Sequence, residues 1–320
     1  MRIDDLESWL ERLWNGDKRA TAKLISQVED NQRRIDIMSQ ILPRTGQRMV
    51  IGITGPPGAG KSSLIEAITQ LYRDQKDKVG IVAVDPSSPY SGGAILGDRI
   101  RMQSHGTDPG VFIRSMGTRG HLGGVARSTI DVLRILEAAG YQRLILETVG
   151  VGQSELEIME LADTVIVVLN PGAGDGIQAI KAGIMEIADI FVVNKADLPG
   201  AERLKNDIQM MLDLNGEKSW RAPVVLTSVI DQRGLTELHN QITAHQNFLI
   251  ESGKNLERQK KAFRQEVWSH WEEITRQTFE TTWANWINTR DVLEQKNPYQ
   301  LAEKIWTTIL SLESKNHSSR

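Results

Sequence analysis

Residues 55–62 read GPPGAGKS, and the prediction of the fold starts from these eight residues. It matches the pattern G-x-x-x-x-G-K-[ST] of a phosphate-binding loop, in which glycines allow backbone N–H groups to point at phosphate oxygens. The run MVIGIT (49–54) before it has the apolar, β-branched character of a buried strand. The run SSLIEAITQLY (62–72) after it has helical spacing. A strand, this loop and a helix in that order predict a nucleotide-binding P-loop.

Each position of the loop has an expected role. Lys61 would reach the β- and γ-phosphates, the Ser62 hydroxyl would bind Mg²⁺, and Ser63 would donate to the α-phosphate. The dipole of the following helix adds positive potential at its N-terminus. The remaining residues that we expect to line the phosphates are Gly55, Pro56, Pro57, Gly58, Ala59 and Gly60.

Seven short aliphatic runs are spread along residues 48–245, with helical spacing between them. They are MVIGIT (49–54), VGIVAVD (79–85), VFIR (111–114), RLILET (143–148), TVIVVLN (164–170), DIFVVNK (189–195) and APVVLTS (222–228). Because they are apolar along their length rather than alternating, both of their faces must be covered, as in a parallel sheet. We therefore predict an α/β P-loop fold with a mostly parallel, doubly wound sheet flanked by helices.

The character of the sequence divides the chain into three zones. Residues 1–45 have amphipathic helical spacing and form an expected N-terminal helical segment, residues 46–247 hold the P-loop domain, and residues 248–320 form an expected C-terminal helical arm. The arm is densely charged. Its tryptophans either pack onto the main domain or form a self-association surface, since large aromatic side chains are enriched at interfaces. They are Trp268, Trp271, Trp283, Trp286 and Trp306.

The composition of the 320 residues excludes several classes of protein. Its 38 basic and 41 acidic residues give a formal net charge of −3, which argues against a broadly cationic nucleic-acid binder. Cysteine is absent, so disulfides and cysteine-ligated metal sites are excluded. The N-terminus lacks the apolar region of a signal peptide, and no stretch approaches the roughly 20 apolar residues of a membrane helix. We expect a cytoplasmic protein with no membrane or nucleic-acid partner.

Asn194-Lys195-Ala196-Asp197 follows a late strand and matches the guanine-reading element N-K-x-D of GTPases. The Asp197 carboxylate can accept hydrogen bonds from guanine N1–H and the exocyclic amine, a donor pair that adenine lacks. The Lys195 stem can lie over the base, and Asn194 can tie neighbouring loops together. After the last predicted strand, Ser228 and Val229 fit a loop whose backbone N–H groups contact guanine O6. On its own NKAD also fits a turn at a helix start, but behind a P-loop it predicts GTP and GDP as ligands.

Three acidic residues are candidate Mg²⁺ ligands beside Ser62. Glu147 follows a strand at the position where GTPases place an acid that meets Mg²⁺ through water, and the N–H of Gly150 would meet the γ-phosphate. Asp85 ends the second predicted strand and either reaches the metal or only forms the turn before Pro86. Asp98 either joins the metal when its glycine-rich loop closes or only caps the next helix. Lys61, Glu147 and Asp85 are the candidate catalytic residues.

Five stretches together resemble the MeaB/ArgK family, the GTPase chaperones of adenosylcobalamin-dependent methylmalonyl-CoA mutase. They are GPPGAGKS (55–62), VDPSSPYSGGAILGDRIRM (84–102), RGHLGGVAR (119–127), ETVGVGQSE (147–155) and NKAD (194–197). The resemblance covers about residues 10–245. It implies Lys61 on phosphate, Asp197 on guanine, and Asp85, Asp98 and Glu147 around magnesium. It also implies an adenosylcobalamin-dependent acyl-CoA mutase as partner and a homodimer joined through the C-terminal arm.

Residues 174–181, GDGIQAIK, depart from the family pattern G-D-[DE]-L-Q-x-I-K, because Gly176 stands where the family carries an acid. We interpret His121 as structural rather than catalytic, and Gln153 is the nearest candidate for positioning the attacking water.

Three alternative functions remain open. They are a nickel metallochaperone GTPase, a kinase or ATPase linked to amino-acid transport, and a non-catalytic nucleotide-binding scaffold. Six scattered histidines without cysteine argue against the metallochaperone, and NKAD argues against ATP.

Overall fold

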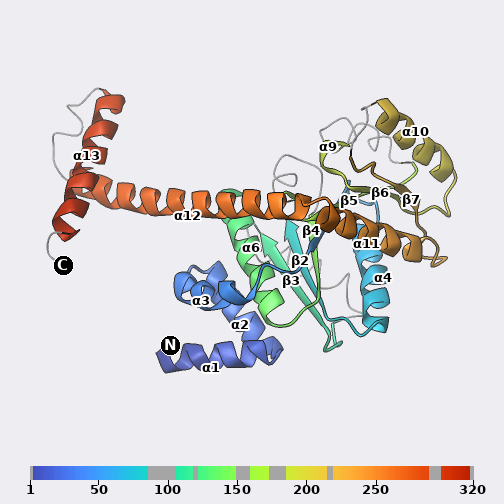
Figure 1. Ribbon diagram of the computed structural model, residues 1–320, viewed down its shortest axis with the longest axis horizontal. Coiled ribbons are helices and arrows are strands. Elements are labelled where there is room, and N and C mark those ends of the chain that lie inside the picture. Colours follow the sequence, from blue (N-terminus) through green and yellow to red (C-terminus); the bar gives the residue numbers. More distant parts are fainter. Residues whose placement is uncertain are drawn as a thin grey trace. The chain divides into compact units, whose positions relative to one another are not determined.

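In the computed structural model, a seven-stranded sheet forms the core of the part of the chain that contains the predicted P-loop (Figure 1). The structure describes residues 3–85, 106–117, 122–148, 159–172, 185–214, 219–287 and 297–317. The strands are β1 (Val50–Thr54), β2 (Val79–Asp85), β3 (Val111–Gly117), β4 (Arg143–Thr148), β5 (Thr164–Leu169), β6 (Ile190–Val193) and β7 (Val224–Leu226). Each of the seven predicted runs overlaps one of them. Their order is β3-β2-β4-β1-β5-β6-β7, and all neighbours pair in parallel.

Both faces of the sheet are buried, which confirms the predicted α/β fold. Every residue of β1, β5 and β6 is buried, and successive residues point to opposite faces. On one face, Ile51 and Ile53 belong to a core cluster with residues of α4 (Lys61–Asp74) and α11 (Leu235–Glu251). On the other, Val50 belongs to a cluster with α6 (Leu122–Ala138) and α10 (Ala201–Leu214). A short helix, α9 (Met185–Ile187), precedes β6.

Three N-terminal helices extend this second core, as the amphipathic spacing predicts. They are α1 (Ile3–Trp14), α2 (Lys18–Glu29) and α3 (Arg34–Ile41), followed by the 3-10 turn η1 (Leu42–Arg44), and they lie beside α6 (Figure 1). The break between α1 and α2 comes from Gly16, at φ 76°, and from Asp17, whose side chain accepts hydrogen bonds from the backbone of Arg19 and Ala20. A buried ion pair between Arg34 and Asp131 joins α3 to α6.

The chain order places the carboxyl end of β1 at a switch point of the sheet. From β1 the chain passes to β2 and β3 on one side, returns to β4 beside β1, and then crosses to β5 on the other side. In open α/β sheets, ligands bind where such a reversal leaves a crevice at the carboxyl ends of the strands. The predicted P-loop follows β1 directly, so the fold places it at this crevice.

The chain divides into two compact units, Met1–Arg258 and Gln259–Arg320. The long helix α12 (Lys254–Ile287) supplies most of its length to the second unit, which also contains α13 (Pro298–His317). Within this unit, Trp283 packs against a small buried cluster on α13 that consists of Leu301, Ile305 and Ile309. Among the described residues, no helix combines the length and apolar character that crossing a membrane requires.

Candidate functional site

The loop between β1 and α4 has the geometry of a P-loop, and two of its glycines are required by close contacts. Gly55 has φ 146°, and a Cβ atom there would lie 2.1 Å from the carbonyl oxygen of Val168 on β5. Gly60 has φ 89°, and a Cβ atom there would lie 2.4 Å from Nδ2 of Asn194. Because L-residues with side chains rarely adopt positive φ and lack this space, only glycine fits either position.

Helix α4 begins at Lys61 with Gly60 as its N-cap, so the first turn offers its N–H groups to the crevice. Lys61 itself is buried, and its ammonium donates hydrogen bonds to the carbonyl oxygens of Gly55 at 2.8 Å and Pro56 at 3.1 Å. The positive charge is therefore held against the loop at which the sequence predicts phosphate. Ser63 lies in the first turn of the helix and is exposed.

The candidate metal ligands Ser62 and Glu147 meet across neighbouring elements. The Ser62 hydroxyl donates to Oε1 of Glu147 at 3.0 Å, and Glu147 is 3% exposed. The pairing of β1 with β4 places Glu147 beside Ile53, directly behind the P-loop. A hydroxyl and a carboxylate are oxygen ligands of the kind that Mg²⁺ prefers, so this pair fits the ion.

The loop after β6 is tied to the P-loop by two side chains. Asn194 is buried, and its Nδ2 donates to the carbonyl oxygens of Ala59 at 3.0 Å and Gly60 at 3.4 Å. Lys195 donates through Nζ to the carbonyl oxygen of Gly58 at 2.8 Å. The segments predicted to hold phosphate and guanine therefore form one connected site, as the role expected for Asn194 requires.

Asp197 is held from the loop after β7. The Ser228 hydroxyl lies 2.9 Å from Oδ1 of Asp197 and 3.1 Å from Oδ2 of Asp231, and Ser228 is fully buried. A hydroxyl carries one proton, so these two carboxylates share it. Val229, the next residue, is partly buried against the core. The structure thus brings the predicted guanine-side residues Asn194, Asp197 and Ser228 together.

Other predicted residues fall outside what the structure describes. Asp85 is the last residue of β2, opposite Gly117 of β3, but its side chain is not among the described ones. The remaining residues of this kind are Asp98, His121, Gly150, Gln153 and Gly176.

Some contacts at the site were not expected from the sequence. Thr148 of β4 donates its hydroxyl to that of Thr54 of β1 at 3.0 Å, and both residues are fully buried. This bond joins the residue before Gly55 to the residue after Glu147. Arg233 donates through Nη2 to the carbonyl oxygen of Ala196 at 2.8 Å. The sequence does place Thr54 and Thr148 at the ends of two predicted strands. It does not show that these two strands are neighbours in the sheet, and the hydrogen bond depends on that.

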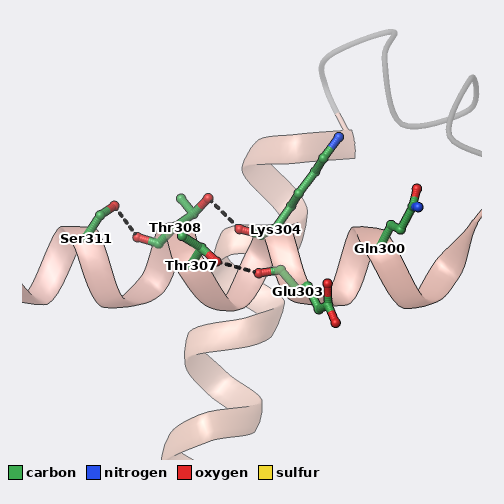
Figure 2. Close-up of a pocket in the computed structure, with 6 residues that line it drawn as sticks. All are labelled: Gln300, Glu303, Lys304, Thr307, Thr308 and Ser311. Atoms are coloured by element: carbon green, nitrogen blue, oxygen red, sulfur yellow. Dashed lines mark hydrogen bonds between the residues drawn. The ribbon is translucent and has the colours of Figure 1, made fainter.

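A hollow on α13 is a weaker candidate for a ligand site (Figure 2). Thr307 and Thr308 donate their hydroxyl hydrogens to backbone oxygens one turn earlier, at 2.8 Å each, and Ser311 does the same at 2.7 Å. The hollow contains no predicted site residue, and no group of three metal-binding side chains occurs among the described residues. We interpret it as the polar face of a helix. Its lining residues are Gln300, Glu303, Lys304, Thr307, Thr308 and Ser311.

Comparison with known proteins finds relatives that are named GTPases. The model of the family described as methylmalonyl-CoA mutase-associated GTPase MeaB matches residues 21–284. A Pyrococcus abyssi protein is 50% identical over 270 residues, which are 83% of this chain and 82% of the relative. The GTPase ArgK of Escherichia coli is 36% identical over 255 residues, 77% of each chain. The mitochondrial methylmalonic aciduria type A homolog of Mus musculus is 35% identical over 270 residues, 82% of this chain and 64% of the relative.

One solved structure resembles the whole chain. The structure described as LAO/AO transport system kinase superposes with a TM-score of 0.70 at 24% identity, and the match covers 97% of this chain and 99% of the other. At this identity the likeness establishes the P-loop fold with its helical additions and leaves the activity to other observations.

Proposed function

Because the chain belongs to the family of methylmalonyl-CoA mutase-associated GTPases, we propose that it is a Mg²⁺-dependent G-protein chaperone of an adenosylcobalamin-dependent acyl-CoA mutase. In this proposal the bound nucleotide, GTP or GDP, controls when the mutase is loaded with its cofactor and protected. The family match carries the proposal, because its description names both the GTPase activity and the mutase. The site supports it with a complete P-loop and a guanine-side loop joined to it.

The geometry supports GTP rather than ATP as the nucleotide. The carboxylate of Asp197 is fixed by the buried Ser228 hydroxyl at 2.9 Å, so one of its oxygens has a defined direction. A carboxylate held in this way accepts two hydrogen bonds from guanine and finds no such donor pair on adenine, which would leave it unpaired. Phosphate binding through the P-loop is common to both nucleotides, so the base loop provides the selection.

The protein would promote hydrolysis mainly by holding charged groups in place around the phosphates, because phosphoryl transfer requires little covalent chemistry from the protein. Lys61 holds a positive charge at the loop and would stabilise the negative charge that develops between the β- and γ-phosphates. Ser62 and Glu147 would hold Mg²⁺, with Asp85 and Asp98 as further proposed ligands. Mg²⁺ held by these residues would neutralise part of the negative charge on the phosphates.

The alternative functions have less support. The likeness to the LAO/AO transport system kinase lies below 25% identity and concerns the fold only. A nickel metallochaperone would need metal-binding side chains, and the six scattered histidines and the lack of cysteine argue against it. Guanine selection at Asp197 would also distinguish the proposal from an ATP-dependent kinase.

We also propose that two copies of the chain form a homodimer through the C-terminal arm. The arm is the last of the three expected segments, which are residues 1–45, 46–247 and 248–320. Large apolar side chains on α12 remain exposed, among them Phe263, Trp268, Trp271 and Ile274. Trp268 and Trp271 lie against each other, with ring centroids 5.2 Å apart. A second copy of the same helix is a fitting cover for such a surface, because aromatic side chains are enriched at interfaces.

The experiment that tests the chaperone role is GTP turnover with and without a cognate apo-mutase. We expect slow turnover alone and faster turnover with the mutase, because a partner that binds the hydrolytic conformation shifts the population toward it. Reciprocity then requires that GTP and GDP change the affinity for the mutase, which a binding titration measures. A rate and an affinity that the partner and the nucleotide leave unchanged would contradict the chaperone role and leave the GTPase activity in place.

A variant at Gly176 provides a second comparison in the same assay. Gly176→Asp restores the acid that the family pattern has at this position. We expect it to alter turnover in the presence of the mutase and to leave turnover of the free protein nearly unchanged. If both rates change by the same factor, residue 176 acts on hydrolysis itself rather than on the coupling to the mutase.

A further inference from the structure

The backbone of Ala196, the residue between Lys195 and Asp197, is held at both of its polar groups by the loop after β7. Its N–H donates to the carbonyl oxygen of Thr227 at 2.9 Å. Its carbonyl oxygen accepts a hydrogen bond from Nη2 of Arg233 at 2.8 Å. Asp197 is attached directly to this peptide group, so the direction in which its carboxylate leaves the backbone depends on these two contacts.

The conformation that is held in this way is strained. Lys195 has φ 56°, a left-handed conformation that residues other than glycine, asparagine and aspartate rarely adopt. Such a conformation persists only where surrounding contacts fix it. On one side Lys195 is fixed to the P-loop through Gly58. On the other side, Thr227 and Arg233 fix the residue that follows it.

Arg233 is itself placed accurately by its own loop. Ser228 and Arg233 exchange two backbone hydrogen bonds, of 3.0 Å and 2.9 Å, which close the loop between them. The following residue, Gly234, has φ 77°, and a Cβ atom there would lie 1.9 Å from the carbonyl oxygen of Leu226. The backbone at Arg233 is thus fixed without help from its side chain, so replacing that side chain removes the contact to Ala196 and leaves the loop closed.

We propose that Arg233 is a positioning residue that determines nucleobase specificity by holding the Ala196–Asp197 peptide in the orientation that guanine requires. The inference rests on the proposed guanine site at Asp197 and adds a residue that does not touch the base. Arg233 acts on the base loop alone, because neither its side chain nor its loop contacts the P-loop among the hydrogen bonds of the described residues. Its loss should therefore weaken recognition of the base and leave phosphate binding unchanged.

The test is the affinity of Arg233→Met for GDP, IDP and ADP, measured by calorimetry on the full chain. Methionine keeps an aliphatic stem and removes the donors. We expect GDP to bind about three- to tenfold more weakly, the value of one hydrogen bond at a solvent-exposed position. IDP lacks the exocyclic amine and has one fewer bond to Asp197, so it should lose less. The affinity for ADP should stay within about twofold.

Two further variants separate positioning from general damage. Arg233→Lys keeps a donor on a long stem and should recover part of the GDP affinity. Arg221→Met is the matched control, because Arg221 is an exposed arginine of the same unit that pairs with Asp213 away from this loop. It should leave all three affinities unchanged.

The outcomes distinguish this inference from the proposed function. Equal losses for GDP and ADP, or an unchanged GDP affinity in Arg233→Met, would overturn the role of Arg233 while guanine selection stands. Asp197→Asn is the reference for the site itself. If the wild-type protein fails to prefer GDP over ADP, or if Asp197→Asn binds GDP normally, the guanine site is wrong and the role of Arg233 falls with it.

Discussion

At the scale of single residues, the side chains of Ser62 and Glu147 are proposed to hold Mg²⁺ together. One hydrogen bond of 3.0 Å joins them. We expect Ser62→Ala to raise the Mg²⁺ concentration needed for half-maximal GTP turnover, since it removes an oxygen ligand. Glu147→Gln removes the charge that orients the serine hydroxyl, and loss of such a supporting group typically costs about 10–100-fold in metal affinity or activity. A titration of Mg²⁺ in the turnover assay measures both effects.

Ser62→Thr is the control for this prediction, because it keeps the hydroxyl and the P-loop pattern accepts either residue. Its Mg²⁺ dependence should stay close to that of the wild-type protein. A half-saturating Mg²⁺ concentration that remains the same in Ser62→Ala and in Glu147→Gln would remove both residues from the metal site.

How far the sequence predicts single residues depends on how local their contacts are. The P-loop lies within eight consecutive positions, so its pattern alone anticipates the glycine turn, in which Gly55, Gly58 and Gly60 have positive φ. The bond between Thr54 and Thr148 depends on the pairing of β1 with β4, which no local pattern contains. The contact of Arg233 with Ala196 likewise depends on how the loop after β7 closes.

At the scale of elements, an ionic cluster at the start of β6 joins this strand to helices α11 and α12. Asp189 accepts a hydrogen bond from the backbone of Val165 at 2.9 Å, and its Oδ1 lies 3.2 Å from both Nε2 of His245 and Nη2 of Arg258. Burial acts to raise the pKa of Asp189, but its bonds and charge interactions with His245 and Arg258 outweigh burial and lower the pKa below its usual value.

This cluster predicts how stability depends on pH. Because the pKa of Asp189 is lower in the folded than in the unfolded chain, its stabilisation is present above the unfolded pKa of about 3.9 and is lost as the pH falls through the folded pKa. Asp189→Asn should reduce the free energy of unfolding by about 1–3 kcal/mol at pH 7, and the difference from the wild-type protein should shrink near pH 3. Urea unfolding at the two pH values measures it.

Asp213→Asn is the matched control for the pH prediction, because Asp213 pairs with Arg221 at an exposed position. Exposed ion pairs contribute little to stability. The free energy of unfolding of this variant should therefore differ from that of the wild-type protein by less than about 1 kcal/mol at either pH. Asp163, whose pKa is raised by its burial, is retained in all three proteins. A deficit in Asp189→Asn that is equally large at both pH values would show that packing rather than charge is responsible.

The ends of the strands show which element boundaries can be predicted from the sequence and which cannot. β2 and β4 begin and end where their aliphatic runs do, at Val79–Asp85 and Arg143–Thr148. β3 continues past the predicted Arg114 to Gly117, because pairing with β2 extends through Ser115 and Met116, which are outside the apolar run. β6 stops at Val193, as expected from the position of Asn194 and Lys195 directly after the strand, and Lys195 turns the backbone to positive φ.

At the scale of the whole molecule, the two compact units have surfaces of different kinds. The first unit encloses both core clusters of the sheet, whereas the second has a small core on α13 and exposes large apolar side chains along α12. The predicted helical arm therefore exists as helices, but the sequence left open whether its tryptophans face the main domain or a second copy. Trp268 and Trp271 lie against each other and are not buried within the second unit, so their aromatic surface is open to either contact.

Truncation of the arm tests whether it joins two copies of the chain. A chain that ends at Lys261 keeps all of the first unit, including Arg258 and its contact with Asp189. We expect the full chain to be a dimer and the truncated chain to be a monomer. The truncated chain should bind GDP with unchanged affinity, because every residue proposed to hold the nucleotide lies in the retained unit. The double variant Trp268→Glu, Trp271→Glu should also weaken the dimer without removing any residue. Light scattering over a range of concentrations measures both. A truncated chain that remains dimeric would place the interface on the first unit, and a full chain that is monomeric at every concentration would rule out self-association through the arm.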